Sequence, residues 1–225
     1  MTDAPDIQAR RQALLNDIFA TAQDANRQPN TIKLVAVSKR QPEARLEAAL
    51  AAGQRVFGEN RVQEAQAHWA GRRAGWPDLE LRLIGPLQSN KAADAVALFD
   101  VIETLDREKL ARALRKEMDA QKRAPRLLVQ VNTGEEPQKA GVPPAELPDF
   151  VGRMRTHYGF TIDGLMCIPP VEEPPGLHFA LLAKLAADLG VPELSMGMSS
   201  DYPTAIRLGA TSVRVGTGFF GPRDS

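Results

Sequence analysis

The sequence predicts an α/β protein of the TIM-type (β/α)8 barrel class, and three observations support this prediction. Eight short runs rich in β-branched and aliphatic residues recur along the 225 residues. Longer stretches with apolar residues at helical spacing separate these runs. Each connection is long enough to cross over the sheet, so the strands pair in parallel, and eight such strands close most simply into a barrel. An open doubly wound sheet is the structural alternative.

Each expected element follows from its local pattern. In residues 6–26, Leu14, Ile18 and Ala22 share one stripe, which predicts an additional N-terminal amphipathic helix that helps to complete the outer ring. The eight expected strands are residues 32–37, 55–57, 81–84, 101–104, 126–131, 162–166, 193–196 and 212–215. The clearest helices between them are residues 43–52, 107–121 and 177–189. We expect a single domain over residues 1–225, with the barrel itself over about residues 31–221.

Composition excludes several classes of partner. The 28 basic and 28 acidic residues cancel, so no positive field attracts nucleic acid or an anionic membrane. The single cysteine, Cys167, has no partner for an internal disulfide, and the apolar runs are far shorter than the ~20 residues of a membrane helix. The three histidines show no metal-ligand spacing. We therefore expect a cytoplasmic protein, monomeric and without a metal site, in which Cys167 is a small buried group.

A candidate reactive lysine closes the first expected strand. The functional site of such a barrel lies at the carboxyl ends of its strands. Val35, Val37 and Lys39 alternate onto one face, so Lys39 points into the barrel mouth if the valines fill the interior. Partial desolvation there lowers the pKa of a lysine and leaves a free amine that can attack an aldehyde. The alternative is a lysine that extends from the strand end into solvent.

A candidate phosphate site follows the seventh and eighth expected strands. Ser199 and Ser200 precede a helical stretch at residues 204–208 and suggest a serine-capped helix start. Gly216, Thr217 and Gly218 offer backbone amides that a side chain would otherwise crowd. Phosphate sites in these positions recur in this fold, so the two segments together would bind one phosphate group. Ordinary loop chemistry is the alternative.

Five blocks in the same order resemble the signature blocks of the pyridoxal phosphate homeostasis protein family, which is itself similar to the N-terminal barrel of alanine racemase. The blocks are AVSK at residues 36–39, FGENRVQE at residues 57–64, IGPLQSNK at residues 84–91, SMGMSSD at residues 195–201 and VRVGTGFFG at residues 213–221. One departure is visible: the family usually has an aromatic residue and a histidine where this chain has Leu81 and Arg82. The resemblance therefore carries no role for that histidine.

The resemblance implies that pyridoxal 5′-phosphate is the cofactor and that Lys39 is the Schiff-base lysine. Lys91 and Lys139 follow the third and fifth expected strands and are alternative sites for an aldehyde. Asn60 would hydrogen-bond the phenolic oxygen of the cofactor, or would serve only as a turn residue. The remaining implied cofactor contacts are Ser199, Ser200, Gly216 and Thr217 at the phosphate, and Met196 with Met198 against the ring. Methionines near a barrel mouth also fill gaps in the core, which is the alternative for these two.

Arg214 alternates with Val213 and Val215 and should face the barrel interior, near the pyridine nitrogen if the resemblance holds. An arginine cation there favours the unprotonated ring and weakens it as an electron sink. Carbanion chemistry would then be restrained. The alternative is an Arg214 side chain paired with a carboxylate such as that of Glu103.

The expected function is therefore a non-catalytic carrier or regulator in intracellular pyridoxal phosphate homeostasis, with PLP-dependent apo-enzymes as possible partners. A weakly active amino-acid racemase is the alternative. The racemases that this barrel resembles take a second proton donor, a tyrosine, from an additional β domain, and neither Tyr158 nor Tyr202 is clearly placed for that role. A barrel enzyme that acts on a phosphorylated substrate without a cofactor is a third possibility.

Overall fold

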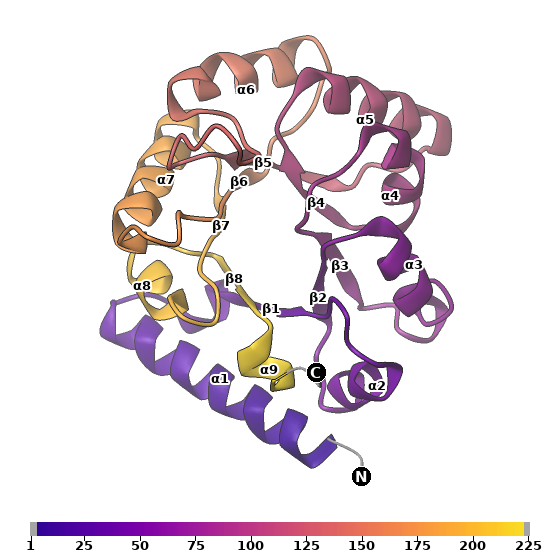
Figure 1. The fold of residues 1–225 in the computed structure, drawn as a ribbon, viewed down its shortest axis with the longest axis vertical. Coiled ribbons are helices and arrows are strands. Elements are labelled where there is room, and N and C mark those ends of the chain that lie inside the picture. Colours follow the sequence, from indigo (N-terminus) through magenta and orange to yellow (C-terminus); the bar gives the residue numbers. More distant parts are fainter. Residues whose placement is uncertain (1–3, 223–225) are drawn as a thin grey trace.

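A computed structural model describes residues 4–222, and its eight strands form a closed barrel in the order in which they occur in the chain (Figure 1). All neighbouring strands pair in parallel, and β1 closes the barrel by pairing with β8. The strands are β1 Lys33–Val37, β2 Val56–Glu59, β3 Glu80–Leu83, β4 Val101–Leu105, β5 Arg126–Val131, β6 Gly164–Cys167, β7 Glu193–Ser195 and β8 Ser212–Val215. The predicted barrel class is confirmed, and the open sheet is excluded.

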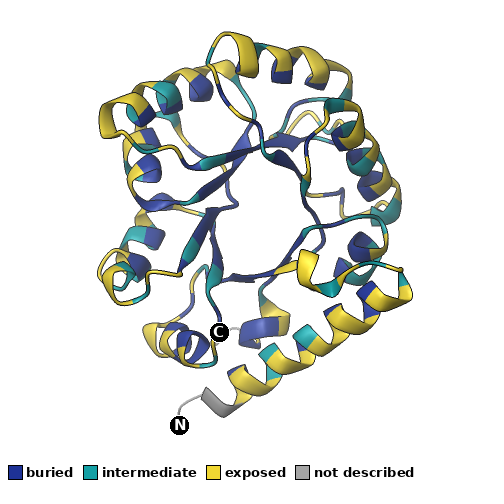
Figure 2. Cartoon of the chain, turned by 180° about the vertical axis from the view of Figure 1, so that it is seen from behind, coloured by how far each residue is buried: buried dark blue, intermediate teal, exposed yellow. Residues whose placement is uncertain are grey.

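Helices surround the barrel and expose their outer faces, whereas the strands are almost wholly buried (Figure 2). The α-helices are α1 Ala4–Asp24, α2 Glu43–Ala51, α3 Val62–Trp69, α4 Ala92–Leu98, α5 Glu108–Gln121, α6 Leu147–Thr156, α7 Pro175–Leu189, α8 Tyr202–Arg207 and α9 Thr217–Phe220. Four 3-10 helices complete the list: η1 Pro29–Thr31, η2 Arg73–Gly75, η3 Ser89–Lys91 and η4 Pro144–Glu146. Within residues 4–222 no helix combines the length and the apolar character needed to cross a bilayer.

The structure corrects two local predictions after β7 and β8. The predicted serine cap is wrong, because Asp201 occupies the N-cap position of α8 and no side chain caps the helix. The Asp201 carboxylate instead accepts a hydrogen bond from the backbone N–H of Met198 at 2.6 Å and so fixes the preceding turn. The segment Gly216-Thr217-Gly218 is not an open turn, because Thr217 begins the short helix α9.

Strand alternation divides the core into two layers. Leu34 and Ala36 belong to the large apolar core between the barrel and its helices, so Val35 and Val37 face the barrel interior. A Cβ added at Gly58 on β2 would lie 3.0 Å from Val35 Cγ1, which also places Val35 inside the barrel. The prediction that the valines face the interior is therefore confirmed.

The barrel interior carries a buried network of charges at its amino end. Arg82 is fully buried and pairs with Glu80 at 2.6 Å, Glu103 at 2.7 Å and Glu193 at 2.5 Å. Burial lowers the pKa of this guanidinium, but the three carboxylates, Glu103 foremost, outweigh burial and raise it above its ordinary value. Arg126 also bridges Glu80 and Glu193. The departure from the family pattern at Arg82 thus has a structural consequence, since this cation is the centre of the network.

Candidate cofactor site

Lys39 lies at the carboxyl end of the barrel, two residues beyond the end of β1, and is partly buried. It lines a cavity of about 220 Å³ together with Arg40, Asn60, Arg61 and Glu64. Within the described residues the Lys39 ammonium takes part in no ion pair and no hydrogen bond. Lys39 has the same parity in the sequence as Val35 and Val37, which face the barrel interior, and it lines a cavity at the carboxyl end of the barrel.

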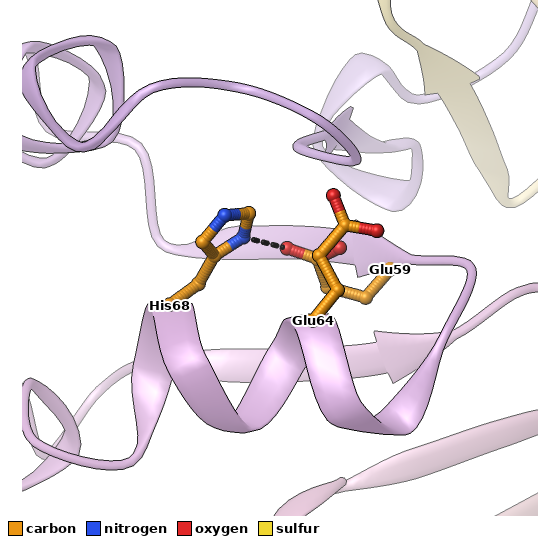
Figure 3. Close-up of side chains that lie close together, drawn as sticks. All are labelled: Glu59, Glu64 and His68. Atoms are coloured by element: carbon orange, nitrogen blue, oxygen red, sulfur yellow. Dashed lines mark hydrogen bonds and ion pairs between the residues drawn. The ribbon is translucent and has the colours of Figure 1, made fainter.

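A buried carboxylate braces the residue before Lys39. Glu59 ends β2, points outward between the barrel and α3, and is fully buried. Its Oε1 accepts hydrogen bonds from Ser38 Oγ at 2.7 Å and Trp69 Nε1 at 2.9 Å, and lies 2.8 Å from His68 Nδ1 (Figure 3). The hydrogen bond that the His68 ring donates to Glu59 raises the pKa of His68 above its ordinary value, although burial acts in the opposite direction.

A second carboxylate braces the residue after Lys39. Glu64 on α3 accepts a hydrogen bond from the backbone N–H of Arg40, which has a positive φ of 57°. Such a left-handed conformation costs a non-glycine residue roughly 1–2 kcal/mol and needs support from its surroundings. The two glutamates therefore fix the turn that presents Lys39 from both sides.

Sequence reasoning missed this group of side chains. Glu59, Glu64 and His68 each offer a possible ligand atom, and these atoms lie within 4.8 Å of one another (Figure 3). The contacts favour a hydrogen-bonded brace over a cation site, because protein donors already occupy Glu59 Oε1 and a carboxylate oxygen of Glu64. A signal was available in the sequence, since Glu64 and His68 are four residues apart and share one face of a helix.

Asn60 lies beside Lys39 in the same cavity, and its side-chain oxygen is buried without a hydrogen-bond partner. Buried polar atoms in proteins nearly always have a partner, so an unpaired one in a residue that lines a cavity makes that residue a candidate for ligand contact. Gly85 makes this arrangement possible, because a Cβ at that position would lie 2.2 Å from the carbonyl oxygen of Asn60. The loops after β2 and β3 therefore meet at Asn60.

The two segments predicted to bind phosphate adjoin each other. Ser199 Oγ lies 3.8 Å from where a Cβ of Gly218 would be, and Gly216 lies against Val37 at the end of β1. Within residues 4–222 the N–H groups of Ser199, Ser200, Thr217 and Gly218 make no backbone hydrogen bond. Ser199, Ser200 and Thr217 are exposed. The structure thus brings together a group of free donors one strand away from Lys39, as a phosphate site requires.

Met196 does not lie where a ligand could touch it. Ser195 on β7 points into the barrel, so Met196 points outward and is fully buried in the core between the barrel and its helices. This position corrects the expectation of a ring contact and agrees with the alternative of a gap-filling methionine. Met198, beyond the bend at Gly197, is only partly buried.

Arg214 on β8 points into the barrel and is 3% exposed. Its guanidinium donates to Ser195 Oγ at 2.6 Å and to the backbone carbonyl of Cys167 at 2.8 Å. The Ser195 hydroxyl in turn donates to Glu103 at 2.5 Å. The alternative of a direct pair with Glu103 is therefore wrong within the described residues, because a hydroxyl separates the two groups.

The other lysines considered for the aldehyde have ionic partners. Lys91 Nζ lies 3.7 Å from a carboxylate oxygen of Asp94, and Lys139 Nζ lies 2.5 Å from one of Glu136. Cys167 is fully buried, and burial raises the pKa of its thiol to about 12. Among the candidate nucleophiles, the geometry therefore favours Lys39.

Comparison with known proteins adds the family. Residues 15–224 match the family model described as alanine racemase, N-terminal domain. The pyridoxal phosphate homeostasis protein of Pseudomonas aeruginosa is 42% identical over 214 residues, which cover 92% of this chain and 91% of that protein. The Escherichia coli protein of the same name is 36% identical over 218 residues, with 92% of each chain covered.

This chain belongs to the pyridoxal phosphate homeostasis protein family.

Solved structures agree with this membership. PipY of Synechococcus elongatus is 40% identical, and the comparison covers 96% of this chain and all of PipY. The TM-score is 0.84 for PipY without PLP and 0.81 for PipY with PLP bound. An alanine racemase of Clostridium difficile has a TM-score of 0.70 at 13% identity and covers 94% of this chain and 56% of the racemase, so it shares the fold alone. The resemblance between this homeostasis family and the racemase barrel is thereby confirmed.

Proposed function

We propose that this protein binds pyridoxal 5′-phosphate as a Schiff base with Lys39 and acts as a non-catalytic carrier or regulator of this cofactor inside the cell. The single observation that carries the proposal is a partly buried lysine, Lys39, which has no ion pair within residues 4–222 and lines a cavity together with Asn60 at the carboxyl end of the barrel. Family membership supports it, because the relatives are named for pyridoxal phosphate homeostasis and PipY has a structure with PLP bound.

The residues at the mouth have different roles in binding the cofactor. Lys39 supplies the amine that forms the covalent bond, and the amide of Asn60 donates to the phenolic oxygen. Ser199, Ser200, Gly216 and Thr217 hold the phosphate through hydroxyl and backbone N–H groups. The bound cofactor contributes an aldehyde carbon that condenses with amines and a ring that withdraws electrons.

Arg214 makes the site a poor catalyst. Its buried guanidinium points into the barrel interior, so the charged group expected beside the pyridine nitrogen is a cation and not a carboxylate. A cation next to the pyridine nitrogen would disfavour protonation of the ring. An unprotonated ring would withdraw electrons less strongly, which would suit storage and transfer better than turnover.

For the alternative racemase function, neither tyrosine is placed as a second proton donor in the structure of residues 4–222. Tyr202 is buried and its hydroxyl donates to Asp17 on α1, outside the barrel. Tyr158 follows α6 and stacks on Phe160 with ring centroids 5.8 Å apart. Two-base racemisation needs an acid on the face of the substrate opposite the lysine, and neither tyrosine is at the mouth.

The first test is reductive trapping. The purified protein is incubated with pyridoxal phosphate, reduced with borohydride, digested and mapped by mass spectrometry. We expect the label on Lys39, its loss in Lys39→Ala, and its retention in the control variants Lys91→Ala and Lys139→Ala. A label that stays in Lys39→Ala at the wild-type level would refute the assignment of the covalent site.

The second test separates carrier from enzyme. The loaded protein is incubated with L-alanine and other L-amino acids, and the D-isomers are measured. We expect no turnover, whereas rates of about 1 per second or more, the range of ordinary enzymes, would contradict the carrier function. A separate experiment tests transfer of the cofactor. The loaded protein is mixed with a PLP-dependent apo-enzyme, and the activity of that enzyme is followed over time. Faster activation of the apo-enzyme than with an equal concentration of free cofactor would support a role in delivery.

A further inference from the structure

A second cavity adjoins the Lys39 cavity, and its lining comes from the segments that follow β2, β3 and β4. Figure 1 shows the strands that these segments follow. Its volume of about 640 Å³ lies within the range of about 300–1,000 Å³ that is typical of sites for small organic ligands. It is lined by Asn60, Arg61, Val62, Gln63, Pro86, Leu87, Gln88, Lys91 and Arg107. Asn60 and Arg61 also line the smaller cavity, so the two compartments share a wall.

The charges that line this cavity are all positive. Arg61 follows β2, Lys91 ends η3, and Arg107 precedes α5, so three separate loops each contribute one cation. No aspartate or glutamate is among the lining residues. All three side chains would attract an anion bound in this cavity.

The three cations differ in the ion pairs and hydrogen bonds that they make within the protein. Arg107 donates to Asp106 at 2.5 Å and to the Leu87 carbonyl at 2.7 Å, and Lys91 is 3.7 Å from a carboxylate oxygen of Asp94. The side chain of Arg61 has no ion pair or hydrogen bond within residues 4–222. Arg61 therefore keeps a complete set of guanidinium donors for a ligand.

Neutral donors and apolar surface complete the lining. The side-chain amides of Gln63 and Gln88 make no hydrogen bond within the part of the chain that the structure describes. Leu87 and Val62 are buried and supply the apolar wall. A cavity of this size with several separated cations fits an organic molecule with more than one acidic group better than a single inorganic ion.

From these contacts we propose that this cavity is a second ligand site, separate from the Lys39 cavity, that binds a small organic polyanion with two or more carboxylate or phosphate groups. Arg61 is its main anchor, and Lys91 and Arg107 add charge from the neighbouring loops. Because the two cavities share Asn60 and Arg61, a ligand here would adjoin whatever occupies the Lys39 cavity.

The test is calorimetric titration of the purified full-length protein, free of pyridoxal phosphate, with citrate and with inorganic pyrophosphate. We expect saturable binding of at least one probe, weaker at high KCl because these cations are partly exposed to solvent. Arg61→Gln should weaken binding about tenfold, equivalent to about 1.4 kcal/mol, and Lys91→Gln should also weaken it. A response to citrate alone identifies a polycarboxylate site, and a response to pyrophosphate alone identifies a phosphate site.

Matched controls make the outcome decisive. Lys184→Gln on α7 removes an exposed lysine that pairs with Asp188, and it should leave binding unchanged. The proposal is overturned by absence of binding of both probes or by equal weakening in Lys184→Gln. Binding of a hexaglutamate peptide without binding of either probe would also overturn it, in favour of a protein partner.

Discussion

Removal of the Glu59 carboxylate is the sharpest test of how the fold positions Lys39. In Glu59→Ala three donors lose their shared acceptor: the Ser38 hydroxyl, the Trp69 indole and the His68 ring. Each of the first two is fully buried, and the His68 side chain is 13% exposed. Water can therefore replace the lost acceptor only poorly for these three donors.

The expected loss of stability depends on which acceptors remain for each donor after the Glu59 carboxylate is removed. A buried donor without a partner costs about 1–3 kcal/mol. Ser38 falls at the low end of that range because the Gly58 carbonyl, 3.4 Å away, offers another acceptor, whereas Trp69 falls nearer the middle. Glu59 Oε2 is buried without a partner, so its removal recovers part of this loss. We expect a net destabilisation of about 3 kcal/mol, or a fall in Tm of about 6–12 °C for a chain of this size.

The assay is urea unfolding followed by tryptophan fluorescence, together with trapping of pyridoxal phosphate on Lys39 at a temperature where every variant is folded. Glu59→Gln retains an oxygen acceptor and should lose only about 1 kcal/mol and keep most of the labelling. Glu47→Ala, which removes an exposed carboxylate from α2, should change stability by less than about 1 kcal/mol. A Glu59→Ala protein with wild-type stability and wild-type labelling would refute the reasoning that Glu59 braces the Lys39 turn.

Three other predictions test the rest of the molecule. Arg82→Met leaves the buried Glu103 carboxylate without its cation and should lower the free energy of unfolding in urea by about 3–5 kcal/mol. The double variant with Glu103→Leu should recover part of this loss. If the losses of the two single variants simply add in the double variant, this account is wrong. The raised pKa of His68 stabilises the fold fully below its ordinary value of about 6.5, and this contribution is lost as the pH rises through the folded-state pKa. The difference in the free energy of unfolding between wild type and His68→Gln should therefore be larger at about pH 6 than at about pH 9. A difference that grows as the pH rises would contradict the raised pKa of His68. Cys167, with its pKa raised to about 12, should resist thiol reagents at about pH 8 until the protein unfolds, and rapid labelling of the native protein would show that the thiol is accessible.

Much of the barrel could be predicted because its signals are local. Every strand lies within two residues of its predicted run, since β-branched runs and amphipathic stretches depend only on neighbouring residues. The interior position of Val35 and Val37 was predictable for the same reason, because alternation along β1 depends only on that strand. The ring contact of Met196 was implied by the family resemblance and not by the strand pattern, and its burial in the outer core agrees with the alternative of a gap-filling methionine.

By itself the sequence determined the fold class, the strand that Lys39 follows and the two segments after β7 and β8 whose backbone N–H groups are free. Only the tertiary structure decided that Glu59 braces Ser38, that Arg82 gathers three carboxylates inside the barrel and that Arg61, Lys91 and Arg107 surround one cavity. The physical reason is that periodicity records which face of its own element a residue occupies. Which side chains from distant elements meet on that face depends on the register and closure of the barrel, and these exist only once all eight strands have paired.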